Sequence, residues 1–274
     1  MSTHPAAADA TAVRSMTAFS LDTAALFAAE LADAARPIVE RYFRSDVDVE
    51  SKADESPVTV ADRTVERTLR DLIEARYPDH GIAGEEYGVI RPDADYVWSL
   101  DPIDGTKAFI SGRPTFGTLV GLLHDGVPVL GMVDCPILNE RWIGGPDVPT
   151  RLNNNPLPPV QHRPLDAATL VATSPDMFKG FEVDAFARLK AAAGLTLYSG
   201  DCHNFGLLAL GTLDLVVESD LQDYDYLAPA AMIAGAGGVL TDWSGGPARL
   251  GSTTRIVAAR DPALHAEALK FLAG

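Results

Sequence analysis

Apolar side chains recur at helical spacing in the first part of the chain. Over residues 20–43 they keep to one face of a helix, and Ser20 is well suited to cap it. A second apolar stripe predicts a helix from Asp62 to Tyr77, which Pro78 would end. The polar residues 52–57 predict an exposed turn between these helices.

Short apolar runs then predict strands, and their arrangement changes along the chain. Strand-like stretches come first at residues 82–86 and 96–100. A meander is expected next, with strands at 115–123, 127–134 and 141–144 and a hairpin turn at 124–126. Residues 146–164 are rich in Pro and Asn and predict the boundary between two subdomains, called the seam below. Beyond the seam, strands at 169–173, 196–199, 213–218 and 239–242 alternate with helices at 183–193, 204–210 and 228–236, which is typical of an α/β half. The predicted division is a leader over residues 1–18, an N-terminal α+β subdomain over 19–148 and a C-terminal α/β subdomain over 149–274.

Composition narrows the class of protein. The 274 residues are 47% hydrophobic and 22% charged, as in a soluble globular protein. A net charge of −16 disfavours a nucleic-acid groove, because phosphates would be repelled. Two cysteines supply neither a disulfide framework nor a zinc cluster, which fits a cytoplasmic protein. No apolar run reaches membrane-spanning length, and residues 1–18 lack the apolar core of a signal peptide, so we expect a disordered leader and no membrane partner.

Residues 97–109 carry the first indication of chemistry. The apolar strand is expected to stop at Pro102, which has no N–H for a sheet ladder, and Gly105 allows a tight turn. Asp101 and Asp104 lie three positions apart on this turn. Two carboxylates that close repel each other unless a cation lies between them. The turn is therefore either a Mg²⁺ cradle or an ordinary strand-to-helix connection with an aspartate cap.

Other acidic residues extend this pattern. Glu85 and Glu86 follow an apolar stretch, and they are either solvated surface or neighbours of the Asp101 strand end. Asp225 precedes an apolar helix and, taken alone, is typical of an N-cap. Carboxylates at strand ends and at a helix start together favour a divalent-metal site.

Motifs for other chemistries are incomplete. The glycines at 235–238 miss the spacing of a dinucleotide fingerprint at Leu240 and follow a helix, so they predict a helix end and a turn. The chain has no G-x-x-x-x-G-K-[ST] loop and no G-x-S-x-G elbow. The six histidines are scattered, and no motif supports Cys202 as a nucleophile. Covalent catalysis by a side chain is therefore disfavoured.

The acidic residues resemble those of the inositol monophosphatase superfamily from about Ser20 to the C-terminus. The resemblance rests on Gly84-Glu85-Glu86, on Asp-Pro-Ile-Asp-Gly-Thr at 101–106, and on Asp225 before an Ala-rich helix and Gly-Gly-Val. It implies Mg²⁺-dependent phosphomonoesterase activity and a layered α-β-α-β-α fold of α and β elements. Residues 104–110, 117–119, 134–137, 200–209 and 223–227 are similar to the histidinol-phosphate phosphatases of histidine biosynthesis, although His203 and Phe205 stand where tyrosines are expected.

The resemblance implies two Mg²⁺ sites. Glu85, Asp101 and the Ile103 carbonyl would hold one ion. Asp101, Asp104 and Asp225 would hold the second, and the pair would clamp the attacking and leaving oxygens.

The resemblance also implies how water would be activated. Water would attack phosphorus, with Thr106 and Glu86 orienting and deprotonating it. The N–H groups of Gly105 and Thr106 would bind phosphate oxygens. Lys52 and Asp62 match a lysine and an aspartate that family members place near the site, where a third, weaker metal is allowed.

The other end of the substrate should meet Asp201, Asn204 and Glu218. Histidinol phosphate carries an ammonium and an imidazole that carboxylates can bind, whereas inositol phosphate offers hydroxyl groups. Asp201 is the more discriminating residue, unless it merely caps the helix that follows it.

The leading hypothesis is hydrolysis of histidinol phosphate. The alternatives are an inositol-1-phosphate or broad sugar-phosphate phosphatase, a nucleotide 3′-phosphatase, and an idle metal-binding scaffold. The last is disfavoured because all expected ligands and Thr106 are present. Relatives are commonly homodimers, so the resemblance implies a homodimer with a small phosphate ester as its substrate.

Overall fold

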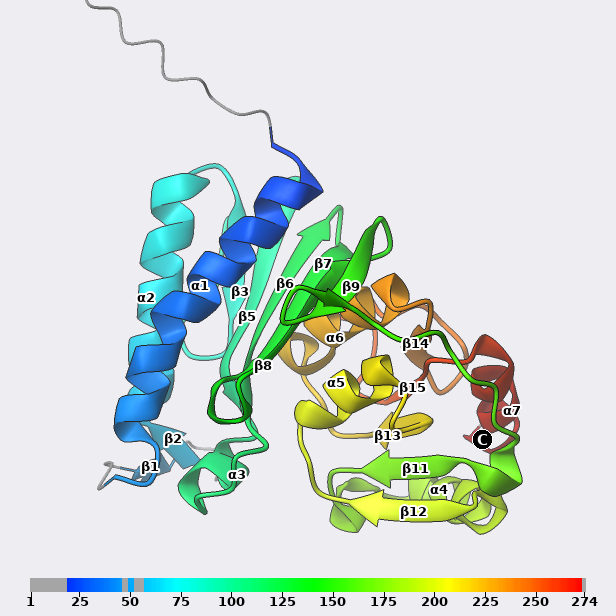
Figure 1. Cartoon of the computed structure of the whole chain (residues 1–274). Helices are drawn as coiled ribbons and strands as arrows, with labels where there is room; N and C mark the ends of the chain where they lie inside the picture. Colours follow the sequence, from blue (N-terminus) through cyan, green and yellow to red (C-terminus); the bar gives the residue numbers. More distant parts are fainter. Residues whose placement is uncertain (1–18, 46–48, 52–56, 273–274) are drawn as a thin grey trace, which may run out of the picture.

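The computed structural model describes residues 19–45, 49–51 and 57–272 (Figure 1). The leader expected at residues 1–18 and Lys52 lie outside the described residues. Figure 1 shows five layers in the order helices α1 and α2, first sheet, helices α5 and α6, second sheet, helices α4 and α7. The layered α-β-α-β-α fold that the resemblance implies is therefore confirmed.

The first sheet has eight strands in the order β10-β9-β8-β7-β6-β5-β3-β4. Strands β3 and β5 are parallel, and the other neighbours are antiparallel. Leu122 of β6 belongs to the core beneath α1 and α2, whereas Leu123 faces the core formed with α5 and α6. The strands are β3 (Gly81–Gly84), β4 (Gly88–Ile90), β5 (Tyr96–Asp104), β6 (Gly117–His124), β7 (Val127–Cys135), β8 (Glu140–Gly145), β9 (Val148–Leu152) and β10 (Asn155–Pro156).

Helices α1 (Leu21–Tyr42) and α2 (Val60–Arg76) cover the outer face of this sheet (Figure 1). Ser20 caps α1 as predicted, because its Oγ accepts the Thr23 N–H at 3.2 Å. A ribbon of β1 (Val49–Ser51) and β2 (Pro57–Thr59) precedes α2, and the short helix α3 (Thr106–Ile110) follows β5.

The second sheet has five strands in the order β12-β11-β13-β15-β14. Strands β11, β12 and β13 are parallel, so their carboxyl ends meet at one edge. No helix in the described part of the chain is both long and apolar enough to cross a bilayer. The strands are β11 (Thr169–Ala172), β12 (Leu195–Tyr198), β13 (Leu215–Glu218), β14 (Val239–Asp242) and β15 (Ile256–Ala259), and the helices are α4 (Phe181–Ala192), α5 (His203–Leu210), α6 (Asp223–Gly235) and α7 (Pro262–Leu272).

The position of α6 depends on two glycines in the middle of the first sheet. A Cβ at Gly131 would lie 1.9 Å from the carbonyl oxygen of Ala228, and a Cβ at Gly121 would lie 3.3 Å from its nitrogen. Because only hydrogen fits at Gly131, α6 can lie directly on β6 and β7. Asp225, one turn before Ala228, is thereby held at a fixed depth beside the sheet.

The strand that carries Asp101 does not stop at Pro102, as the sequence pattern predicts. Strand β5 continues to Asp104, and its pairing with β6 resumes there after a bulge that begins at Asp101. Pro102 lies in the bulge, where no ladder N–H is required, and its carbonyl accepts the Thr118 hydroxyl at 2.8 Å. The two aspartates therefore lie on a bulged strand and not on a loose turn.

The C-terminal half follows the predicted alternation, with three differences. Helix α6 begins at Asp223 and not at residue 228, so Pro229 lies inside the helix and beyond its first turn. The pattern does not predict β15, because four apolar residues cannot be assigned to a strand by periodicity alone. It does not predict α7 either. The first sheet extends to Pro156, so the boundary expected between residues 148 and 149 falls inside β9.

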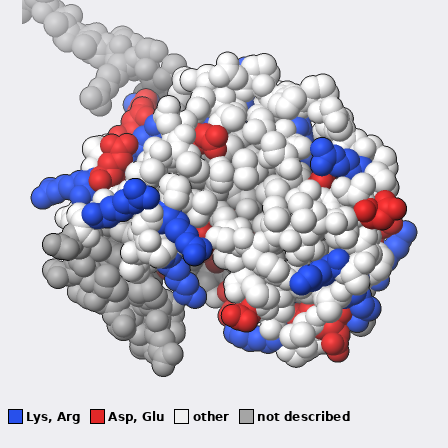
Figure 2. All heavy atoms as spheres, turned by 60° about the horizontal axis from the view of Figure 1, so that its bottom comes forward, with Lys and Arg blue, Asp and Glu red and all other residues white. Residues whose placement is uncertain are grey.

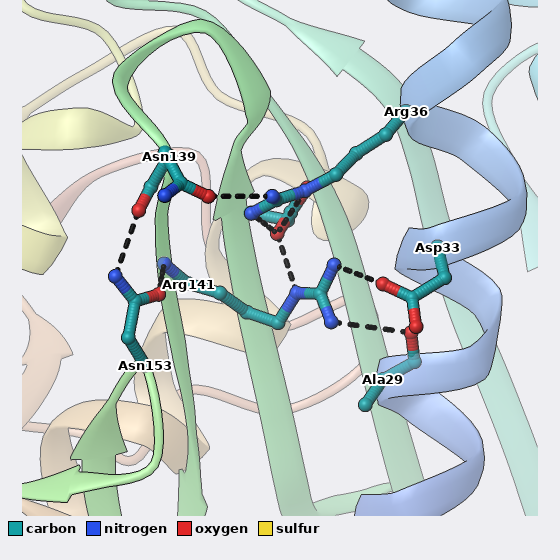
Figure 3. A network of polar contacts seen from close by, with 7 residues as sticks. Ala29, Asp33, Arg36, Asn139, Arg141 and Asn153 are labelled. Carbon is teal, nitrogen blue, oxygen red and sulfur yellow. Dashed lines mark hydrogen bonds and ion pairs between the residues drawn. The ribbon is translucent and has the colours of Figure 1, made fainter.

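A buried carboxylate fastens α1 to the first sheet (Figure 3). The Asp134 side chain is 1% exposed and accepts N–H bonds from Arg36 of α1 at 2.8 and 2.9 Å and from Arg141 of β8 at 2.6 Å. Arg141 also donates to Asp33 at 2.7 Å, and Arg36 donates to Asn139 at 2.8 Å. Two guanidinium groups share this buried carboxylate, so its removal would take from Arg36 its ion-pair partner and leave Arg141 with Asp33 alone.

Asp134→Ala is expected to lower the free energy of unfolding by about 3–5 kcal/mol, because it breaks a buried ion pair from one side. Urea unfolding measures this loss. Asp33→Ala is the matched control, since Asp33 is 70% exposed and also contacts Arg141. The control should cost less than about 1 kcal/mol. Equal losses in the two variants would contradict the role of burial.

Candidate active site

Two parallel strands bring the first acidic residues together. Gly84 of β3 lies in register with Leu100 of β5, and the Glu85 N–H donates to the Leu100 carbonyl at 3.3 Å. Glu85 therefore lies immediately beyond β3, next to the Asp101 segment of β5. The Glu86 side chain is only 3% exposed, so the glutamate pair is not solvated surface.

Helix α6 brings another carboxylate to the same place from far along the chain. Asp101, Asp104 and Asp225 each offer a carboxylate oxygen that lies within 4.8 Å of the other two. The Oδ2 of Asp225 accepts the Gln222 N–H at 2.7 Å, and Gln222, not Asp225, is the N-cap of α6. The Oδ2 of Asp104 accepts the Cys202 N–H at 2.7 Å. Backbone N–H groups from two helix starts therefore hold two of the three aspartates.

These carboxylates crowd one another in a desolvated place. Burial raises the pKa of Asp101 well above its ordinary value, and the charges of Glu85 and Asp104 raise it further. Burial, and then the charge of Asp225, raise the pKa of Asp104 in the same way. Burial also raises the pKa of Asp225 to about 7, against the opposing Gln222 N–H. The cluster therefore favours a bound cation or bound protons over free carboxylates.

A divalent cation fits this arrangement. The Oδ1 of Asp101 is buried and accepts no hydrogen bond from the described residues. A cation would supply its missing partner and relieve the repulsion among the carboxylates. The side chains that gather here offer only oxygen, the donor that hard ions such as Mg²⁺ prefer. The cluster of Asp101, Asp104 and Asp225, with Glu85 adjacent, can therefore hold a metal.

Gly105 follows Asp104, and another residue at this position would strain the backbone. Gly105 has φ 82°, and a Cβ there would lie 2.9 Å from the Asp201 Cβ. The Thr106 hydroxyl then donates to the Ile103 carbonyl at 3.2 Å. Ile103, Gly105 and Thr106 therefore lie together on the turn after Asp101, and the phosphate and metal roles expected of them stay predictions.

Asp201 faces this turn from the second half of the chain. Residues 199–201 all have positive φ, which bends the loop before α5. The Oδ2 of Asp201 accepts the Thr115 hydroxyl at 3.3 Å, and its side chain lies against Gly105. Helix α5 is capped at Cys202 without any side-chain hydrogen bond. The carboxylate of Asp201 therefore does not cap that helix, and it remains a candidate for binding substrate.

Asn204 and Glu218 are both buried but have different partners. The Nδ2 of Asn204 donates to the Ser199 carbonyl at 3.1 Å, so Asn204 fastens the 199–201 loop. The Oε1 of Glu218 accepts the N–H and the hydroxyl of Thr173, each at 2.9 Å, whereas Oε2 has no partner among the described residues. Burial raises the pKa of Glu218 to about 8, although the Thr173 bonds oppose this. One buried carboxyl oxygen of Glu218 is thus left for a ligand.

Basic side chains lie near this acidic centre. Lys107 and Arg113 both lower the pKa of Asp201, which burial raises more strongly. Figure 2 shows basic side chains beside a hollow, with acidic atoms at its edge, on the view in which the bottom of Figure 1 has come forward. Positive charge beside the opening would attract an anionic substrate, although the chain as a whole carries −16.

The remaining predicted residues are only partly placed. Asp62 of α2 is buried, and its charge raises the pKa of Asp101, so it lies near the cluster. Lys52 lies outside the described residues. Sequence reasoning missed Tyr224, whose hydroxyl pKa is raised by burial and by the charge of Glu85. Its position next to Asp225 was the available indication.

Comparisons with known proteins show the family and the fold that this chain shares. The model of the inositol monophosphatase family matches residues 20–273. The chloroplastic bifunctional phosphatase IMPL2 of Arabidopsis thaliana is 42% identical over 261 residues, which cover 92% of this chain and 75% of that protein. A histidinol-phosphatase of Chlorobaculum parvum is 33% identical over 223 residues, 80% of this chain and 85% of that protein. An inositol monophosphatase from Zymomonas mobilis has a TM-score of 0.85 at 42% identity and covers 93% of this chain and 99% of its own.

The five-layer fold and the carboxylate cluster together define a phosphatase of the class that needs a metal. The chain belongs to the inositol monophosphatase family. Members of this family are generally metal-dependent, and the cluster of Asp101, Asp104 and Asp225 is the part of this chain that meets that need.

Glu218 predicts a pH dependence of stability in the metal-free protein. Its pKa of about 8 exceeds the ordinary 4.5, so the folded state holds a proton that the unfolded state releases between these values. The stability it contributes is complete below about pH 4.5 and is lost as the pH rises to about 8. With a chelator present, the Tm of the wild type should therefore fall more steeply than that of Glu218→Gln over this range.

The matched control for this prediction is Glu74→Gln, because the Glu74 side chain is 47% exposed. The control should follow the wild type at every pH. Parallel curves for the wild type and Glu218→Gln would contradict the raised pKa.

Proposed function

We propose that the chain is a Mg²⁺-dependent phosphomonoesterase that hydrolyses L-histidinol phosphate to L-histidinol and phosphate. The observation that carries this proposal is the Asp201 carboxylate, which faces Gly105 and Thr115 instead of capping α5. A carboxylate in this place can bind the ammonium group of histidinol phosphate, which inositol phosphate lacks. The similarity to a histidinol-phosphatase supports the same substrate.

The acidic cluster supplies the ligands that this activity needs. Bound there, Mg²⁺ would neutralise phosphate charge and make a nearby water more acidic. We assign the ligand set as the resemblance implies, with enough oxygens for two ions: Glu85, Asp101, Asp104, Asp225 and the Ile103 carbonyl.

The protein's own groups position the reactants. Glu86 lies beside the cluster with its side chain nearly buried and 3.7 Å from Arg63, and it accepts the proton of the attacking water. Thr106 orients that water, while the N–H groups of Gly105 and Thr106 bind phosphate oxygens. Phosphate monoesters hydrolyse very slowly unaided, so positioning and charge neutralisation together carry the rate enhancement.

A second candidate substrate is an inositol phosphate or another polyol phosphate. Glu218 favours it, because a carboxyl with a pKa of about 8 is protonated at neutral pH and can bond hydroxyl groups both as donor and as acceptor. A cationic head group would instead favour ionised Glu218 and release its proton on binding. The two substrates therefore place opposite demands on the same side chain.

A panel of phosphate esters tests the proposal. With Mg²⁺ present, kcat/KM should be highest for histidinol phosphate among histidinol phosphate, inositol 1-phosphate, glycerol 2-phosphate and a nucleoside 3′-phosphate. A higher value for inositol 1-phosphate would favour the second candidate. Hydrolysis of none of them would contradict the proposed activity.

The substitution Asp201→Asn tests whether the Asp201 charge binds the ammonium group of the substrate or whether the residue only supports the fold. The Thr115 hydroxyl can still donate to the Asn oxygen, so the Tm should be unchanged. A charge-assisted bond contributes roughly 1.5–3 kcal/mol, so kcat/KM on histidinol phosphate should fall roughly tenfold or more. Glycerol 2-phosphate serves as the control substrate and should change little. Equal losses on both esters would reject this role.

Asp104→Asn and Asp225→Asn should fold but lose at least about 100-fold in kcat, because each leaves an incomplete clamp around the reacting phosphate. The measurement is turnover of histidinol phosphate at saturating Mg²⁺. Asp223→Asn is the matched control, since Asp223 lies in the same helix turn but bonds Tyr226 and Gly251. Near-normal turnover of Asp104→Asn or Asp225→Asn would remove the metal assignment.

A further inference from the structure

A buried ion pair lies beneath the turn that carries Glu85 and Glu86. Glu66 of α2 is 0% exposed, and its Oε1 accepts the Arg70 Nε–H at 2.7 Å. Arg70 also donates to the Gly88 carbonyl on the far side of the turn. A Glu–Arg pair four residues apart is ordinarily a surface contact of small energetic effect. Here the pair is buried against the β3–β4 connection, where a charge is retained only if its hydrogen bonds are satisfied.

The Glu66 carboxylate satisfies the backbone of that turn. Its Oε2 accepts the Glu86 N–H at 2.6 Å, and its Oε1 accepts the Tyr87 N–H at 3.2 Å. The preceding N–H, that of Glu85, donates to the Leu100 carbonyl of β5. Three successive backbone N–H groups are therefore fixed, one by the strand that carries Asp101 and two by Glu66.

The space beneath the turn is filled by this ion pair. A Cβ at Gly84 would lie 2.1 Å from the Glu66 Oε1 and 2.8 Å from the Arg70 Nη2. Contacts this short do not occur in folded proteins, so the pair and the backbone at Gly84 are in direct contact. In this arrangement Glu66, Arg70 and the N–H groups of Glu85, Glu86 and Tyr87 all have hydrogen-bond partners.

We propose that Glu66 is a positioning residue for metal binding, which it supports through the backbone of Glu86 and Tyr87, the two residues that follow Glu85. This inference rests on the proposed Mg²⁺-dependent function. Arg70 balances the charge of Glu66, so the turn is fixed without adding uncompensated negative charge beside the carboxylate cluster. Without Glu66, the N–H groups of Glu86 and Tyr87 would lose their partner. Only the Leu100 bond would then fix the turn, and the side chains of Glu85 and Glu86 would be less well oriented toward the cluster.

The test compares Glu66→Gln with the wild type by calorimetric titration of the metal-stripped protein with Mg²⁺. Gln keeps the shape of Glu but has one acceptor oxygen where three N–H donors converge. Loss of a group that orients metal ligands commonly lowers metal affinity by roughly 10–100-fold. We expect a weakening of at least about tenfold, with kcat largely recovered at saturating Mg²⁺.

Asp214→Asn is the matched control for a merely structural role. Asp214 is also a buried carboxylate that accepts a backbone N–H, from Thr169 at 2.8 Å, and pairs with Arg163 at 3.3 Å. It precedes β13, at the opposite end of that strand from Glu218. Its replacement should lower the Tm without weakening Mg²⁺ binding.

Four results are decisive. Unchanged Mg²⁺ affinity in Glu66→Gln, or an equal loss in Asp214→Asn, would overturn the positioning role. If Glu66→Gln does not fold, Gly84→Ala provides the same test, because it displaces the Glu66 carboxylate without removing its charge; unchanged affinity there would also overturn the role. Failure of the wild type to bind Mg²⁺ would instead reject the proposed function on which this inference rests.

Discussion

Repulsion among enclosed carboxylates is the constraint on which this structure depends. Asp101 and Asp104 come from a strand of the first sheet, and Asp225 comes from a helix that lies between the sheets. Folding must bring their charges together, and hydrogen bonds from the Cys202 and Gln222 backbones offset only part of the cost. The surrounding layers must therefore be stable enough to hold the three carboxylates together. Their negative charge is balanced only when a cation or protons bind.

Local chemistry accounts for the parts that the sequence predicts well. A serine before an amphipathic stretch caps α1, and Asp125 and Gly126, both with positive φ, form the hairpin turn expected between β6 and β7. The aspartates at 101 and 104 and the glycine at 105 lie within one short stretch, so their proximity needs no knowledge of the rest of the fold. Asp225, taken alone, cannot be distinguished from a helix cap by any local pattern. It joins the predicted metal site only together with the other carboxylates, and the resemblance to a known family then assigns it to one ion.

Contacts between distant segments decide the parts that the sequence does not reveal. Pro102 is accommodated in β5 because a bulge in the pairing with β6 removes the need for its N–H. The start of α6 is set by a capping box in which Asp225 bonds Gln222, and the apolar pattern alone begins later. Glu66 and Arg70 have the spacing of an ordinary surface pair, and only the fold shows that the β3–β4 turn covers them. In each case the missing information is which partner the tertiary structure supplies.

The missing side chains of Gly121 and Gly131 limit which substitutions the site can tolerate. These residues carry no functional group, yet they set how deeply α6, and with it Asp225, sits against the sheet. A larger side chain in mid-strand would move the Asp225 carboxylate by displacing the whole helix, without touching any charged group. The absence of a side chain at Gly121 and Gly131 is therefore a requirement of the site, although neither residue takes part in its chemistry. A substitution at either glycine can alter the site from the interior of the sheet.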